Sequence, residues 1–125
     1  MKRLLDGTGY AYVQRKPSVW SIAFQGKSLG KSVVVVALTP KLIVMFAIVS
    51  PGASIEKSPQ LMQALLRANS TFDYVKIGFD HDGALFVRLD APSRLTDARQ
   101  LKTDIEQVMR ASDEVSGQIA HYVKH

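Results

Sequence analysis

Segment 26–32, with the sequence GKSLGKS, combines glycine and lysine in a way that resembles a phosphate-binding loop. Such a loop has four residues between its glycines and a helix directly after it, because the amides at the helix N-terminus bind the phosphate. Here three residues separate Gly26 from Gly30, and the valine run that follows is typical of a strand. We therefore interpret the segment as the loop of a β-hairpin.

Two other segments contain side chains that ligate metals. Asp80, His81 and Asp82 are consecutive, whereas a calcium loop of the EF-hand type has ligands at alternate positions and a terminal glutamate. His121 and His125 have the i, i+4 spacing of a helical metal pair, but they stand at the end of the chain. We interpret the first group as turn-forming residues. We expect no metal, no cofactor, no catalytic residue and no enzymatic activity.

The composition excludes several further chemistries. The chain has 125 residues, of which 46% are hydrophobic and 22% charged, and it has no cysteine. A disulfide framework, a thiolate zinc site, an iron–sulfur cluster and a cysteine nucleophile are therefore excluded. The length fits a single domain over residues 1–125. Because the lack of cysteine fits a reducing compartment, we expect a cytoplasmic protein.

The positive charge is concentrated in the first half of the chain. The formal net charge is +5 at pH 7, and residues 1–60 carry eight Lys or Arg against two acids. Residues 61–125 carry eight against nine. A basic surface can attract nucleic acid, anionic lipid or an acidic protein. The basic residues are scattered singly or in pairs, which favours solvated strand edges and turns, so nucleic acid is the less favoured partner.

The longest apolar stretch, residues 33–49, is VVVVALTPKLIVMFAIV. Its 17 residues reach the lower limit for a membrane helix. However, segment 39–41, Thr-Pro-Lys, places a proline and a charge at its centre, and the flanking Val and Ile favour strands. We predict two buried strands, 32–38 and 42–49, joined by a tight turn, and no membrane span.

Alternation and helical spacing predict the other elements. The expected strands span residues 10–15, 19–25, 32–38, 42–49, 73–80 and 85–89. The expected helices span residues 1–6, closed by Gly7 and Gly9, residues 58–69, with Ser58 as N-cap and Asn69 as terminator, and a long segment from Thr96 or Asp97 to Tyr122. Short connections make the first four strands an antiparallel meander. We predict an α+β fold: a two-layer sandwich whose antiparallel sheet of about five to six strands packs with a middle helix and a long C-terminal helix.

Strands 32–38 and 42–49 are apolar on both faces, whereas half-buried antiparallel strands normally alternate with polar residues. If both main helices lie on one face, the other face needs cover. The N-terminal segment and loops, a second copy or a protein partner, or an apolar small ligand are the alternatives. The candidate partner-binding residues are Trp20, Ile22, Phe24, Val34, Val36, Leu42, Val44, Met45, Phe46 and Ile48.

Residues 61–90, LMQALLRANSTFDYVKIGFDHDGALFVRLD, resemble the middle block of the YbjN-like family, which shares its fold with the class I type III secretion chaperones. The resembling parts are the helix end 65–69, the strand 75–80 and the Asp82-Gly83 turn. The resemblance implies a bacterial two-layer α/β domain, often a homodimer, without known catalytic residues. Secretion chaperones hold extended client segments on apolar patches. We therefore expect a non-enzymatic protein-binding or chaperone-like module of unknown client that self-associates. Binding of nucleic acid or anionic surfaces through the N-terminal basic residues is the alternative.

Overall fold

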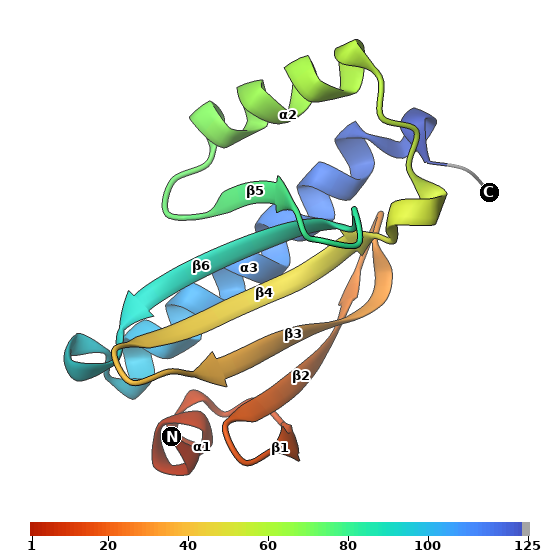
Figure 1. Cartoon of the computed structure of the whole chain (residues 1–125). Helices are drawn as coiled ribbons and strands as arrows, with labels where there is room; N and C mark the ends of the chain where they lie inside the picture. The colour runs from red at the N-terminus through yellow and green to blue at the C-terminus, as the bar shows by residue number, and fades with distance from the viewer. Residues whose placement is uncertain (124–125) are drawn as a thin grey trace.

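A computed structural model, which describes residues 1–123, shows a six-stranded sheet and three α-helices in this part of the chain (Figure 1). The elements are α1 (Lys2–Thr8), β1 (Val13–Lys16), β2 (Val19–Gly26), β3 (Gly30–Leu38), β4 (Leu42–Ser50), α2 (Pro59–Thr71), β5 (Lys76–Phe79), β6 (Leu85–Pro92) and α3 (Ala98–Gln118). This architecture confirms the predicted α+β fold with its middle helix and its long C-terminal helix.

All neighbouring strands are antiparallel, in the order β1-β2-β3-β4-β6-β5. Strands β1 to β4 form the expected meander. The chain then passes through α2, so that β5 becomes the outermost strand and β6 pairs with both β4 and β5. The long apolar stretch forms β3 and β4, as predicted, and no helix within residues 1–123 is long and apolar enough to cross a membrane.

Helix α3 lies across one face of the sheet (Figure 1). The Asp97 carboxylate caps it by accepting a hydrogen bond from the Gln100 amide at 2.8 Å. Its apolar stripe is completely buried against inward side chains of the strands, and α1 packs against the same helix. The fully buried side chains that make this core include Ile22, Val34, Val36, Ile43, Met45, Leu85, Val87, Leu101 and Ile105.

Helix α2 begins as predicted, with the Ser58 hydroxyl accepting from the Leu61 amide and Pro59 in the first turn. The prediction that Asn69 ends this helix is wrong, because α2 continues to Thr71. The Asn69 side chain instead donates to the Ile77 carbonyl at 3.0 Å and accepts from the Ile77 amide at 2.7 Å. Helix α2 therefore flanks β5 and satisfies part of its outer edge.

Two strands are shorter than expected. The segment before β1 is not strand: the strand begins at Val13, and before it the Tyr10 hydroxyl donates to Glu106 of α3 at 3.2 Å and the Tyr12 hydroxyl donates to Asp6 of α1. Before β5, Tyr74 adopts a positive φ of 71°, so the chain turns there and cannot pair as a strand. Helix α3 ends at Gln118 rather than at Tyr122, and a 3₁₀ turn follows it.

Candidate functional site

The phosphate-loop-like segment is the turn between β2 and β3, as interpreted from the sequence. Gly26 pairs with Gly30, whose φ of 74° suits the turn. The amides of Ser28 and Leu29 both donate to one carboxylate oxygen of Asp113 on α3, at 2.8 and 2.9 Å. The hydrogen bond from Leu29 is the main reason that the pKa of Asp113 lies below its usual value. The protein's own carboxylate thus occupies the amides that an anion would need.

The Asp-His-Asp segment also has a structural role. One oxygen of the Asp80 carboxylate accepts from the amides of Asp82 and Ala84, both at 2.9 Å, which closes the turn before β6. The ring of His121 lies beside that of Tyr122, with centroids 4.0 Å apart and the two planes tilted by 39°. Its sequence partner, His125, lies outside the described residues. Within residues 1–123 no group of three or more His, Cys, Asp and Glu is placed to hold a metal ion.

The ten candidate partner-binding residues divide between the two faces of the sheet. Six of them point to the side that α3 covers: Trp20, Ile22, Phe24, Val34, Val36 and Met45. Five of these six are buried core residues, and Phe24 is half-buried against the core. Their position at the centre of the domain leaves the other four as candidates for surface contact.

The remaining candidates, Leu42, Val44, Phe46 and Ile48, point to the opposite side of β4. We call this side the open face, because α1 and α3 pack on the other side and α2 flanks the β5 edge (Figure 1). Ile48 is 37% exposed, Leu42 and Phe46 are half-buried, and Val44 is only 8% exposed. The open face is therefore apolar at its centre and uncovered within residues 1–123.

Neighbouring strands add apolar side chains that were not among the sequence candidates. Val35 pairs with Phe46, Val33 lies two residues away on the same side of β3 and is 38% exposed, and Phe86 pairs with Ile48. The alternation within the valine run contained the signal for the two valines, since every second residue must point away from the core. A hollow of about 210 Å³ is lined by Val44, Phe46, Ile48, Asp80, Phe86 and Arg88.

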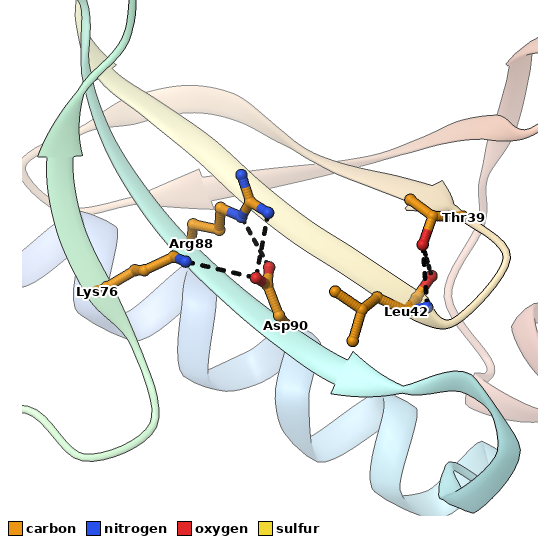
Figure 2. Close-up of polar contacts among 5 residues, drawn as sticks. All are labelled: Thr39, Leu42, Lys76, Arg88 and Asp90. Atoms are coloured by element: carbon orange, nitrogen blue, oxygen red, sulfur yellow. Dashed lines mark hydrogen bonds and ion pairs between the residues drawn. The ribbon is translucent and has the colours of Figure 1, made fainter.

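A charged cluster lies beside this hollow. The Arg88 guanidinium donates to both carboxylate oxygens of Asp90, at 2.7 and 3.1 Å, and Lys76 approaches the same carboxylate at 3.4 Å (Figure 2). The Arg88 hydrogen bond is the main cause of the lowered pKa of Asp90. Arg88 pairs across the sheet with Phe46 on one side and Lys76 on the other. The cluster thus joins the apolar centre to a basic margin.

The basic residues of the first half do not gather in one place. Lys2 and Arg3 belong to α1, and Arg15 to β1, whereas Lys31 and Lys41 lie near opposite ends of β3. This spread favours several separate contacts over a continuous stripe.

Comparison with known proteins identifies the fold. Neither a family model nor a curated protein matches the sequence. A chain of the HopA1–SchA chaperone–effector complex is similar over 93% of this chain and 92% of its own, with a TM-score of 0.70 and 13% identity. YbjN from E. coli matches over 98% and 90%, with a TM-score of 0.64 and 17% identity.

A third similar structure is the Yersinia pestis type III secretion chaperone SycH in complex with a fragment of YscM2. It matches over 90% of this chain and 97% of its own, with a TM-score of 0.61 and 16% identity. The chain therefore has a YbjN-like, type III secretion chaperone-like fold, which confirms the resemblance expected from residues 61–90.

Proposed function

We propose that this chain is a non-enzymatic, chaperone-like module that binds another polypeptide on its open face. The observation that carries the proposal is an apolar sheet face, including the exposed side chains of Val33 and Ile48, with no helix over it within residues 1–123. Uncovered apolar surface of this kind usually marks an interaction site. Solved structures with the same fold support the proposal, since one is a chaperone–effector complex and another a chaperone bound to a fragment of YscM2.

Chemistry on the open face favours binding over catalysis. The side chains around its hollow are those of Val, Phe and Ile together with Arg88 and Asp80, and Arg88 is already hydrogen-bonded to Asp90. A site for acyl transfer needs a nucleophile beside a base, whereas the one carboxylate of this lining, Asp80, accepts hydrogen bonds from the amides of Asp82 and Ala84 and has no serine or histidine beside it in the lining. We therefore propose that the open face is the surface that binds a client protein. Because the chain has no cysteine, we also propose that the protein is cytoplasmic.

Self-association through the same face is a second candidate, because an apolar sheet face can pack against its own copy across a two-fold axis. Sedimentation equilibrium over a range of concentrations tests it. If the wild-type chain is a dimer and the Ile48→Asp variant is a monomer, this candidate is supported. If the wild-type chain is a monomer at every concentration, it is contradicted. Substitution of the exposed Leu66 on α2 by Asp is the matched control, because it changes an apolar side chain away from the open face.

Selection of random displayed peptides on the immobilised protein tests the binding function. We expect selected peptides to bind the wild-type chain and to lose most of their affinity for the Ile48→Asp variant. They should bind the Leu66→Asp variant as they bind the wild type. Failure to select any peptide, or equal loss in both variants, would contradict binding at the open face.

A further inference from the structure

The charged side chains of the open face are predominantly basic. Arg15 lies on this side, because its Nε donates to the Ser21 hydroxyl at 2.8 Å and Ser21 pairs with the outward-pointing Val35. Strand alternation places Lys31 on the same side of β3 as Val33. The open face thus carries four basic side chains, those of Arg15, Lys31, Lys76 and Arg88. It carries two acidic ones, those of Asp90 and, at the rim of the hollow, Asp80.

The register of the sheet arranges these charges beside the apolar centre. Val35 on β3, Phe46 on β4, Arg88 on β6 and Lys76 on β5 form a row across four strands. Along this row the side chains change from apolar to basic within the open face. A segment bound across it would therefore meet apolar contacts at one end and positive charge at the other.

Arg88 retains the capacity to bind a further carboxylate. A guanidinium has five N–H donors, and the contacts with Asp90 use its Nε and one terminal nitrogen. The Arg88 side chain is 36% exposed and that of Lys76 is 60% exposed, so a ligand can reach both. Carboxylates are the natural partners of such a pair, because charge-assisted hydrogen bonds to Arg are short and directional.

We propose that the occupant of the open face is an acidic, extended polypeptide segment. Its apolar side chains pack on Val33, Val35, Phe46 and Ile48, and a neighbouring Asp or Glu binds Arg88 and Lys76. The inference rests on the proposed function and adds the chemical class of the partner. Nucleic acid fits less well, because its phosphates gain nothing from the valines and isoleucine at the centre. A second copy would present a face whose charged side chains are also predominantly basic, which offers Arg88 and Lys76 fewer carboxylates than an acidic segment does.

The sequences of peptides selected on the wild-type chain test this proposal. We expect Asp and Glu to be enriched among apolar residues, and the Arg88→Glu variant to select peptides enriched in Lys and Arg instead. A synthetic acidic peptide from the first selection should bind Arg88→Ala at least about tenfold more weakly by fluorescence anisotropy. Lys102→Glu, an exposed change on α3, is the charge-matched control and should leave that affinity unchanged.

Two results would refute the proposal that the partner is acidic, and they have different consequences for the proposed function. Peptides that need Ile48 but show no acidic enrichment would refute the charge preference and leave binding at the open face intact. A single-stranded oligonucleotide that displaces the peptide and binds more tightly would assign the surface to nucleic acid. Because Arg88→Glu removes the partner of Asp90, Lys76→Glu serves as a second reversal whose side chain is mostly exposed, and circular dichroism verifies that each variant folds.

Discussion

At the scale of single residues, Asp104 is a buried carboxyl on α3. It is 7% exposed, and one of its oxygens accepts from the Gln100 side chain at 2.7 Å. Burial raises its pKa above the ordinary value, so the folded chain binds this proton more tightly than the unfolded chain. The contribution of Asp104 to the free energy of unfolding is therefore greatest below the ordinary pKa. It decreases as the pH rises through the raised pKa of the folded state.

We predict that Asp104→Asn raises the melting temperature at about pH 7, because the amide carries no charge to desolvate. At about pH 3 the carboxyl is already protonated in both states, and the two proteins should melt alike. Thermal unfolding followed by circular dichroism measures this. Asp73→Asn, at an exposed position, is the control; a lower melting temperature for Asp104→Asn at neutral pH would refute the account.

Asp113 has the opposite pH dependence, because amide hydrogen bonds lower its pKa. Its contribution is present above the ordinary pKa and is lost as the pH falls through the lowered value. We predict that Asp113→Ala reduces the free energy of unfolding by about 1 kcal/mol at neutral pH. Denaturation in urea at several pH values measures the loss, which should vanish in acid. Glu114→Ala, at the neighbouring exposed position, should have little effect, and an equal loss there would argue against the turn contacts.

At the scale of elements, the β5 edge depends on Asn69. Its amide satisfies both the N–H and the C=O of Ile77. We predict that Asn69→Ala destabilises the fold by about 1–3 kcal/mol, because two partly buried backbone groups lose their partners. Urea denaturation gives the stability, and light scattering should show more association through the uncovered edge. The exposed Gln63→Ala on α2 is the control; equal stability of the two variants would contradict this role.

The two faces of β4 should respond differently to truncation. Met45 is completely buried under α3, whereas Ile48 lies on the open face. We predict that Met45→Ala costs about 2–5 kcal/mol, because it leaves a cavity in the core. Ile48→Ala should cost less than about 1 kcal/mol. Chemical denaturation of both variants measures the difference, and a reversed order would show that the faces are wrongly assigned.

Local sequence patterns predict most helices and strands. The features that they do not predict depend on contacts between residues far apart in the sequence. The valine run, the Ser58 cap and the Asp97 cap each act over a few residues, so the sequence displays them directly. Asn69 is predicted to end the helix because Asn is common at helix ends. Its actual partner, Ile77, belongs to a strand that the sequence does not place beside it. The turn contact to Asp113 crosses more than eighty residues and has no sequence signal.

The candidate site was only half predictable for the same reason. Alternation separated Val44 and Phe46 from Ile43 and Met45 on β4, but both sets are apolar. Nothing in either set says which one α3 covers, so the candidates included residues from both faces. Only the register and the packing of α3 show that Met45 is core and that Phe46 lies on the open face.

At the scale of the whole molecule, part of the net charge of +5 lies on the open face. The basic excess of the first half reaches the open face through Arg15 and Lys31, and β5 and β6 add Lys76 and Arg88. We predict that binding of an acidic peptide weakens as salt rises, since exposed charges are screened, but does not vanish, since apolar contacts remain. Fluorescence anisotropy between low and high salt measures this. Binding that is independent of salt would contradict the charge contribution.

Binding of a polypeptide to the open face of the sheet should be visible residue by residue in solution. Amide-resolved NMR of the labelled chain, titrated with a peptide selected on the wild-type protein, tests it most directly. We predict that the largest shifts fall on β3, β4 and β6, at Val33, Val35, Phe46, Ile48 and Phe86, and that the exposed residues of α3 hardly change. Shifts concentrated on α2 or α3, with the open face unaffected, would contradict the account.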